Sequence, residues 1–236
     1  GDWLEITWTI IPTVVFLGLF FWGAKVYFDT YRIPENAERF YVVGKQWMWK
    51  IQHPNGKREI NELHVPLGVP MKLTMTSEDV IHSFFVPAFR VKRDVVPGRA
   101  TVMKITPDPD IAGQMIPGQC AEYCGLAHAD MRFRVFVDSE ADFDAWSAEQ
   151  LEPSPIPTEG ATAAGYETFT QFCTTCHEAK VVAADGTVEV VGAALGPDLT
   201  HFGSRTSLAA AIEENTAEHL AQWIDDPSSL KPMSPE

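Results

Sequence analysis

Two cysteines, a histidine and a methionine lie within twelve residues in the stretch GQCAEYCGLAHADM, at Cys120, Cys124, His128 and Met131. Structural zinc sites use thiolate and imidazole but not thioether, so the methionine favours copper. A blue-copper site takes one Cys, two His and a weak axial Met, and this loop has one Cys too many. The second thiolate indicates two bridged copper ions, with a further histidine from elsewhere. Zinc, or a cysteine pair or disulfide beside an incidental His and Met, are the alternatives.

The other two cysteines, Cys173 and Cys176, lie in CTTCH, the attachment motif for c-type haem. In that motif both thiols form thioethers with the porphyrin, and the adjacent histidine, here His177, is placed to become the proximal iron ligand. A thioredoxin-like pair or half of a zinc site is the alternative, but no second pair of zinc ligands and no βαβ pattern accompanies the motif. A distal Met suits electron transfer, and Met233 is the only methionine after Met131, so it is the candidate distal ligand.

The acidic residues are concentrated in the last hundred residues of the chain. The net charge is −14, with 15 Lys and Arg against 14 Asp and Glu in residues 1–137, but 3 against 18 in residues 138–236. Such a surface argues against nucleic acid as a partner and favours association with a basic protein. A surface that is acidic only for solubility is the alternative explanation.

Residues 6–24, ITWTIIPTVVFLGLFFWGA, form a run of 19 residues without a charge. As an α-helix this run would span about 28 Å, close to the hydrocarbon thickness of a bilayer. Trp and Tyr residues lie toward both of its ends, as they do at membrane interfaces. The run is too long for a signal peptide and no basic region precedes it, so residues 1–32 are predicted to form a transmembrane helix in contact with membrane lipid.

The pattern changes twice after this helix. Residues 33–138 read as short strands separated by turns, which predicts an all-β sandwich with the copper-type loop between its last two strands. Residues 139–158 predict a short helix and a proline-rich linker. Residues 159–236 predict a small all-α domain that carries CTTCH. The helical segments expected there are 162–178, 206–214 and 216–225.

Several longer stretches match a known family. They are LEITWTIIP, GKQWMWKI, SEDVIHSFFVPAFRVKRDVVPGR and GQCAEYCGLAHADM, followed by CTTCH, GPDLTHFGSR and LAQWIDDPSSLKPM. With these stretches the chain resembles subunit II of the haem-copper cytochrome c oxidases, in the variant with a fused C-terminal cytochrome c domain. The resemblance implies a membrane-anchored multidomain protein with a cupredoxin-like sandwich. In that family two membrane helices usually precede the sandwich and LEITWTIIP resembles the second, so we expect an N-terminal segment that is absent from this sequence or removed by processing.

The resemblance also supplies the missing imidazole and implies a dinuclear CuA centre. In this pattern Cys120 and Cys124 bridge the two coppers, while His82, in DVIHSF, and His128 each bind one of them. All positions around the metals are then taken by protein groups, so the expected chemistry is electron transfer.

Three further residues receive roles from the resemblance. Met131 and the backbone carbonyl of Glu122 are implied to be weak copper ligands. The Glu122 side chain is implied to reach toward a Mg²⁺ ion at the border with subunit I. Trp47, in QWMWK, is assigned to the electron-entry surface above the copper centre.

The function that the resemblance implies is that of an electron-input subunit of a terminal oxidase. Electrons would pass from an external donor through haem c and CuA to subunit I, which reduces O₂ to water. The expected partners are subunit I and the other oxidase subunits, with a basic soluble cytochrome c or a membrane quinol-oxidising complex as donor. The expected location is the bacterial inner membrane, with the soluble domains on the periplasmic side. The alternatives are the equivalent subunit of a CuA-type nitric oxide reductase and a stand-alone membrane-anchored electron-transfer protein.

Overall fold

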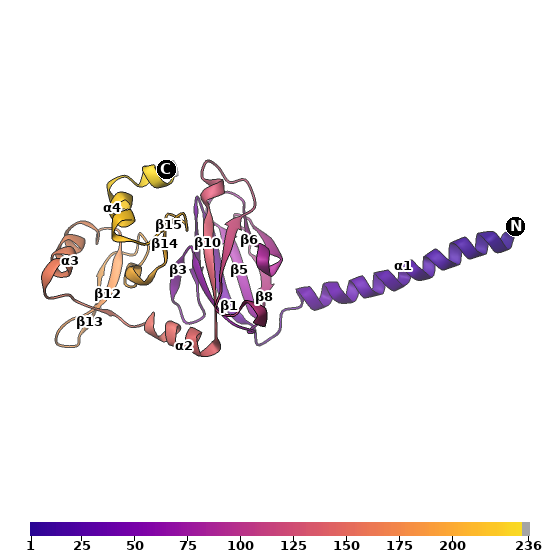
Figure 1. The fold of residues 1–236 in the computed structure, drawn as a ribbon, viewed down its shortest axis with the longest axis horizontal. Coiled ribbons are helices and arrows are strands. Elements are labelled where there is room, and N and C mark those ends of the chain that lie inside the picture. The colour runs from indigo at the N-terminus through magenta and orange to yellow at the C-terminus, as the bar shows by residue number, and fades with distance from the viewer. Residues whose placement is uncertain (233–236) are drawn as a thin grey trace.

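A single long helix, α1 (Asp2–Tyr31), projects away from the rest of the chain in the computed structural model, which describes residues 1–232 (Figure 1). None of its residues is buried, and among the described residues it is the one helix long and apolar enough to cross a membrane. The apolar helix predicted within residues 1–32 is therefore confirmed, and it extends beyond the uncharged run 6–24 at both ends. Lys104 Nζ donates to the carbonyl oxygen of Asp29 at 3.0 Å, and the Arg93 guanidinium lies over the Tyr31 ring, so the end of α1 contacts the next domain.

Two five-stranded sheets form the predicted β-sandwich (Figure 1). Each sheet combines antiparallel neighbours with one parallel pair, β1 with β5 in the first and β4 with β10 in the second. The first sheet has the order β3 (Arg58–Ile60), β2 (Met48–Gln52), β1 (Glu38–Lys45), β5 (Met71–Ser77) and β8 (Thr101–Ile105). The second has the order β4 (Glu62–Pro66), β10 (Arg132–Asp138), β9 (Met115–Cys120), β6 (His82–Val86) and β7 (Val91–Val95).

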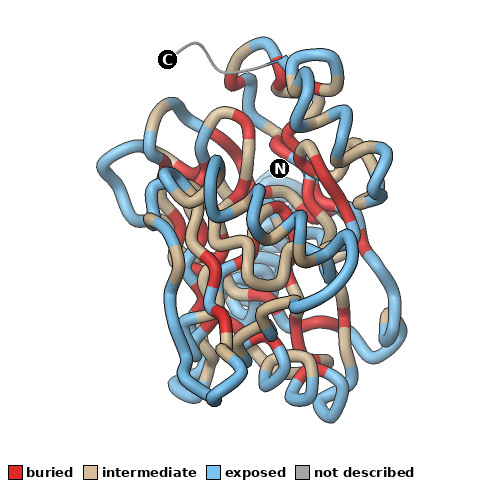
Figure 2. Tube along the Cα trace, turned by 90° about the vertical axis from the view of Figure 1, so that its left-hand side faces the viewer, coloured by how far each residue is buried: buried red, intermediate tan, exposed pale blue. Residues whose placement is uncertain are grey.

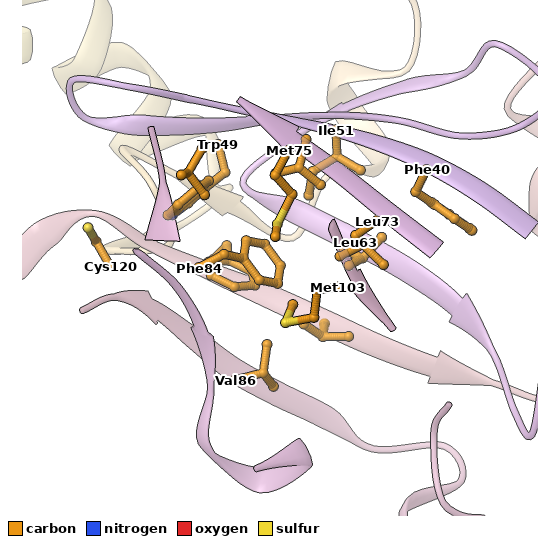
Figure 3. Close-up of a cluster of buried hydrophobic side chains, with 14 of the residues drawn as sticks. Phe40, Trp49, Ile51, Leu63, Leu73, Met75, Phe84, Val86, Met103 and Cys120 are labelled. Atoms are coloured by element: carbon orange, nitrogen blue, oxygen red, sulfur yellow. The ribbon is translucent and has the colours of Figure 1, made fainter. Parts of the chain in front are cut away.

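The core lies between these two sheets because their strands alternate buried and more exposed residues, as in β5 and β10 (Figure 2). Burying each large apolar side chain contributes about 1.5–3 kcal/mol to folding. Trp49, Phe84 and Phe133 form an aromatic cluster at one end, with Phe84 and Phe133 ring centroids 4.4 Å apart. A Cβ atom on Gly118 would lie 2.2 Å from the Phe133 ring, so only glycine permits this packing. Figure 3 shows Cys120 at the margin of the same core.

The sandwich is followed by the helix α2 (Glu140–Glu149), in agreement with the helix predicted there. The Ser139 side chain caps it by accepting a hydrogen bond from the Asp142 N–H. Trp146 on this helix stacks on His64 of β4, with ring centroids 4.0 Å apart. The helix therefore packs on the sandwich before the chain enters the linker.

The C-terminal unit contains helices and short strands (Figure 1). Two of the three expected helices are present, as α3 and α4, and strands absent from the all-α expectation lie between them. Its elements are β11 (Ser154–Pro155), α3 (Gly160–Phe172), β12 (Glu178–Val182), β13 (Val188–Gly192), β14 (Ser207–Leu208), β15 (Glu213–Glu214), α4 (Ala217–Asp225) and α5 (Pro227–Leu230). An Asp-Gly pair in the turn between β12 and β13, flanked by β-branched residues, is a hairpin signal that the helical interpretation overlooked.

The helix expected over residues 206–214 is replaced by the β14–β15 hairpin. Its alanine-rich sequence has a high helix propensity. However, the Glu62 carboxylate of the sandwich holds Thr206 and Ser207 through hydrogen bonds, and residues 209–211 turn the chain with positive φ angles. Contacts with the sandwich thus outweigh the helix propensity of this segment, which is roughly a few tenths of a kcal/mol per residue.

Candidate metal centre

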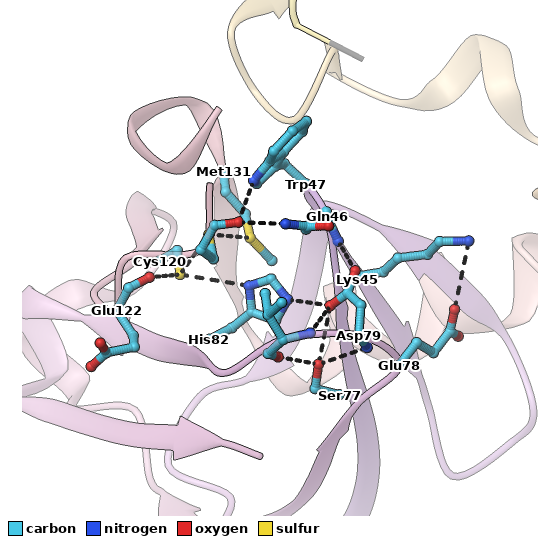
Figure 4. A network of polar contacts seen from close by, with 12 residues as sticks. Lys45, Gln46, Trp47, Ser77, Glu78, Asp79, His82, Cys120, Glu122 and Met131 are labelled. Atoms are coloured by element: carbon cyan, nitrogen blue, oxygen red, sulfur yellow. Dashed lines mark hydrogen bonds and ion pairs between the residues drawn. The ribbon is translucent and has the colours of Figure 1, made fainter. Parts of the chain in front are cut away.

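The chain brings the predicted copper ligands together at one end of the sandwich (Figure 4). His82 is the first residue of β6, and Cys120 is the last residue of β9. Cys124 lies in the following loop, and that loop ends in the short 3₁₀ helix His128–Asp130, directly before Met131. His82 and Met131 are fully buried and both cysteines are nearly so. The ligand set is therefore formed by two strand ends and one loop.

The two sulfur atoms lie at the centre of the cluster. Cys120 Sγ and Cys124 Sγ are 3.8 Å apart and form no disulfide. His82 Nδ1 lies 4.0 Å from Cys120 Sγ, and His128 Nδ1 lies 3.5 Å from Cys124 Sγ. Each sulfur thus faces one imidazole, as a site with two metals and two bridging thiolates requires.

Two weaker donors complete the arrangement. Met131 Sδ lies 3.9 Å from Cys124 Sγ, and the carbonyl oxygen of Glu122 lies 3.2 Å from Cys120 Sγ. The Glu122 residue is exposed, and Figure 4 shows its carboxylate directed away from the sulfur atoms. Soft sulfur and imidazole donors around a shared thiolate pair fit two copper ions better than the oxygen-binding metals.

The cysteine pair favours one thiolate and one thiol. The hydrogen bond from Cys124 is the largest cause that lowers the pKa of Cys120, to about 3, and the same interaction raises the pKa of Cys124. Burial opposes protonation of His82, but hydrogen bonds to Cys120 and Asp79 outweigh it and raise the pKa of that imidazole. Because metal binding needs both sulfurs as thiolates, a cation must displace the remaining proton.

Residues outside the ligand set hold its two halves together. Asp79 Oδ1 accepts from His82 Nε2 at 2.8 Å, which leaves His82 Nδ1 free to face the sulfur atoms. Gln46 joins the two sides, since its N–H donates to Asp79 Oδ2 at 2.7 Å and its side-chain amide donates to the carbonyl oxygen of Cys124 at 2.7 Å. Neither Gln46 nor Asp79 was predicted, although both lie inside the stretches GKQWMWKI and SEDVIHSF that carry the family resemblance.

Trp47 lies beside the copper loop. Its Nε1 donates to the carbonyl oxygen of Cys124 at 2.9 Å, so the indole contacts the copper loop directly. The residue is only 4% exposed, so other residues of this chain cover most of it, and its role in electron entry stays a prediction. One cause is the close approach of the loop, because a Cβ atom on Gly125 would lie 2.9 Å from the indole.

The CTTCH segment follows directly after α3. His177 N donates to the carbonyl oxygen of Cys173 at 2.9 Å, which puts both side chains on one turn. His177 Nδ1 donates to the carbonyl oxygen of Pro197 at 2.8 Å, so Nε2 is the ring nitrogen that could bind a metal. A Cβ atom on Gly196 would lie 2.6 Å from the His177 ring, so this close approach requires glycine. Met233, the predicted distal ligand, lies outside the described residues.

A two-sheet sandwich with two thiols, two imidazoles and a thioether converging at one end defines a cupredoxin-like electron-transfer domain. Residues 59–138 match the family model described as cytochrome c oxidase subunit II, periplasmic domain. The chain belongs to the cytochrome c oxidase subunit II family.

Curated relatives support this membership along most of the chain. Cytochrome c oxidase subunit 2 of Alkalihalophilus pseudofirmus is 34% identical over 97% of this chain and 65% of its own length. The protein of the same name from Bacillus subtilis is 31% identical over 98% of this chain and 68% of its own length. The chain thus spans about two thirds of the length of these relatives. Among solved structures, the chain is similar to the periplasmic domain of subunit II of cytochrome oxidase from Bradyrhizobium japonicum. The sequence identity is 29%, the match covers 50% of this chain and 96% of that chain, and the TM-score is 0.47.

Proposed function

We propose that this chain is the electron-input subunit of a terminal haem-copper oxidase. The observation that carries the proposal is the convergence of two thiols, two imidazoles and a thioether at 3.5–4.0 Å in a member of the subunit II family. When bound, two coppers sharing two thiolates supply one-electron transfer. The rest of the function depends on how the protein holds the side chains that would bind the copper ions.

The sandwich keeps the donors in one geometry. His82 and Met131 are fully buried, and His82 is also fixed by the Asp79 carboxylate. The carbonyl oxygen of Cys124 accepts two hydrogen bonds, from Gln46 and Trp47, so the loop that carries the second thiol is attached to the β1–β2 turn. Metal ligands that cannot rearrange favour electron transfer. Because protein groups would take every coordination position of the metals, no position is left for a substrate.

We further propose that the C-terminal unit carries haem c. Cys173 and Cys176 would form the two thioethers, and His177 would present Nε2 to the iron because Nδ1 is held by the carbonyl oxygen of Pro197. Phe172 and Leu195, which neighbour the motif and Gly196 in sequence, are 69% and 82% exposed. Apolar side chains this exposed beside an attachment motif fit a surface that a porphyrin covers. Met233 is proposed as the distal ligand.

The partner subunit is proposed to be subunit I, which would reduce O₂ to water. α1 would lie in the bacterial inner membrane, with the sandwich and C-terminal unit on the periplasmic side. The exposed carboxylate of Glu122 would reach Mg²⁺ at the border with subunit I. A basic soluble cytochrome c or a membrane quinol-oxidising complex would be the donor, in keeping with the acidic C-terminal residues.

Purification from membranes tests this proposal. The tagged chain should co-purify with a large haem-bearing subunit, and the complex should consume O₂ when given a reduced donor. Cys124→Ser should abolish O₂ consumption while the complex stays assembled. Met115→Leu, at an exposed position of the strand that ends in Cys120, is the control and should leave O₂ consumption intact. Recovery of the chain without a haem-bearing partner would refute the oxidase function.

A further inference from the structure

The C-terminal segment of the chain reaches back to the copper domain at Trp47. Lys231, directly after α5, is only 6% exposed, and its Nζ donates to the carbonyl oxygen of Trp47. In Figure 4 the Trp47 side chain points toward this segment. Trp47, which the family resemblance assigns to electron entry, is thus in contact with Lys231, a residue 184 positions further along the same chain.

A lysine buried in this way is informative because burial of an ammonium group is costly unless it gains a specific partner. Lys231 gains such a partner in the carbonyl oxygen of Trp47. Trp47 in turn donates to the carbonyl oxygen of Cys124, so the lysine is linked to the copper loop through one residue.

A second attachment holds the same unit on the same domain. The Glu62 carboxylate, in a residue only 4% exposed, accepts hydrogen bonds from Thr206 N at 2.9 Å, Thr206 Oγ1 at 2.6 Å and Ser207 Oγ at 2.9 Å. Arg134 Nη1 donates to the carbonyl oxygen of Thr206 at 3.1 Å. Glu62 is paired with Arg134 in the β4–β10 ladder, and Arg134 lies three residues after Met131 in the sequence. Both attachments therefore lie near the copper end of the sandwich.

We propose that residues 227–232 cover the Trp47 face of the copper domain, with Lys231 as the positioning residue that fixes the cover. Electrons would then enter the copper domain from the chain's own C-terminal unit, and a soluble cytochrome would be excluded from docking on Trp47. This inference rests on the proposed function for its consequence, but the cover itself is a property of the fold.

Hydrogen–deuterium exchange on the full chain tests the cover without using copper or electrons. Lys231→Met should raise the exchange of peptides spanning 227–232 and 46–50 by about tenfold or more, which corresponds to losing about 1.4 kcal/mol. Lys231→Arg retains the charged donor and should preserve most of the protection. Lys180→Met, an exposed lysine of the same unit, is the matched control and should change nothing. Unchanged exchange in Lys231→Met would overturn the proposal.

A second experiment tests exclusion of the donor. In full-length Cys173→Ser/Cys176→Ser protein, which cannot attach haem c, a reduced basic cytochrome should reduce the copper centre slowly. Adding Lys231→Met should raise that rate by about tenfold or more, the same factor as the loss of protection. Equal rates with and without Lys231 would overturn the exclusion. A chain that binds no copper would instead defeat the proposed function and leave the exchange result standing.

Discussion

Replacing Glu62 by glutamine should detach the C-terminal unit from the copper domain. The buried carboxylate accepts three hydrogen bonds from Thr206 and Ser207, at 2.6–2.9 Å. Hydrogen bonds to a charged group contribute about 1.5–3 kcal/mol each and neutral ones about 0.5–1.5 kcal/mol. All three bonds end on Oε1, an acceptor that the amide keeps, so the substitution removes the charge assistance of the three bonds, and we expect a net loss of about 2–4 kcal/mol. Burial lowers the pKa of the Arg205 guanidinium, and the negative charge of Glu62 acts in the opposite direction. The glutamine variant also lacks this charge beside Arg205.

Hydrogen–deuterium exchange gives the assay, because the Thr206 N–H itself donates to Glu62. A loss of about 2–4 kcal/mol should speed exchange of the peptide spanning 205–208 by about 30-fold to about 1,000-fold, provided that exchange follows opening of this contact. Glu35→Gln, an exposed carboxylate of the same domain, is the matched control and should leave exchange unchanged. Exchange of 205–208 within about threefold of the wild type, less than 1 kcal/mol, would refute the reasoning.

Three further predictions follow from the sites. Met131→Leu should keep copper bound but shift the potential of the centre, because only a weak ligand is removed. Met115→Leu, at an exposed methionine, should change neither the copper content nor the potential. Metal analysis and redox titration check both variants, and loss of copper in Met131→Leu would contradict the prediction. His177→Ala should leave haem attached through its thioethers but abolish the low-spin ferrous spectrum, and an unchanged absorbance spectrum would exclude His177 as a ligand. Reduction of haem by a basic cytochrome should slow markedly as salt shortens the Debye length from ~10 Å at 0.1 M to ~3 Å at 1 M, while electron transfer within the chain should barely change. Stopped-flow measurements check this, and a rate of haem reduction that does not depend on salt would show that the acidic segment has no role in docking.

Most of the residues that the structure brings together at the candidate copper site could be predicted from the sequence, because they lie in one short loop where spacing alone places them close together. His82 needed the family resemblance, since the strand pairing that brings β6 beside β9 is a long-range feature. Gln46 and Asp79 were missed because a hydrogen bond to a ligand leaves no recognisable spacing. The contact of Trp47 with Lys231 was also missed, because Lys231 lies far along the chain and no local pattern indicates such a contact.

The C-terminal unit shows a different limit. The helices α3 and α4 were predicted because periodicity and capping are local signals. The segment 206–214 was not, because Glu62 in another domain fixes its conformation. Helix propensity is a weak preference, and a buried carboxylate that needs donors outweighs it.

The copper content of the purified chain tests the central claim most directly. We predict that the protein binds two copper ions and that its EPR spectrum shows one unpaired electron split by two equivalent copper nuclei, because Cys120 and Cys124 face each other with one imidazole beside each sulfur. A single bound copper, with hyperfine splitting from one nucleus, or bound zinc with no EPR signal, would contradict the account.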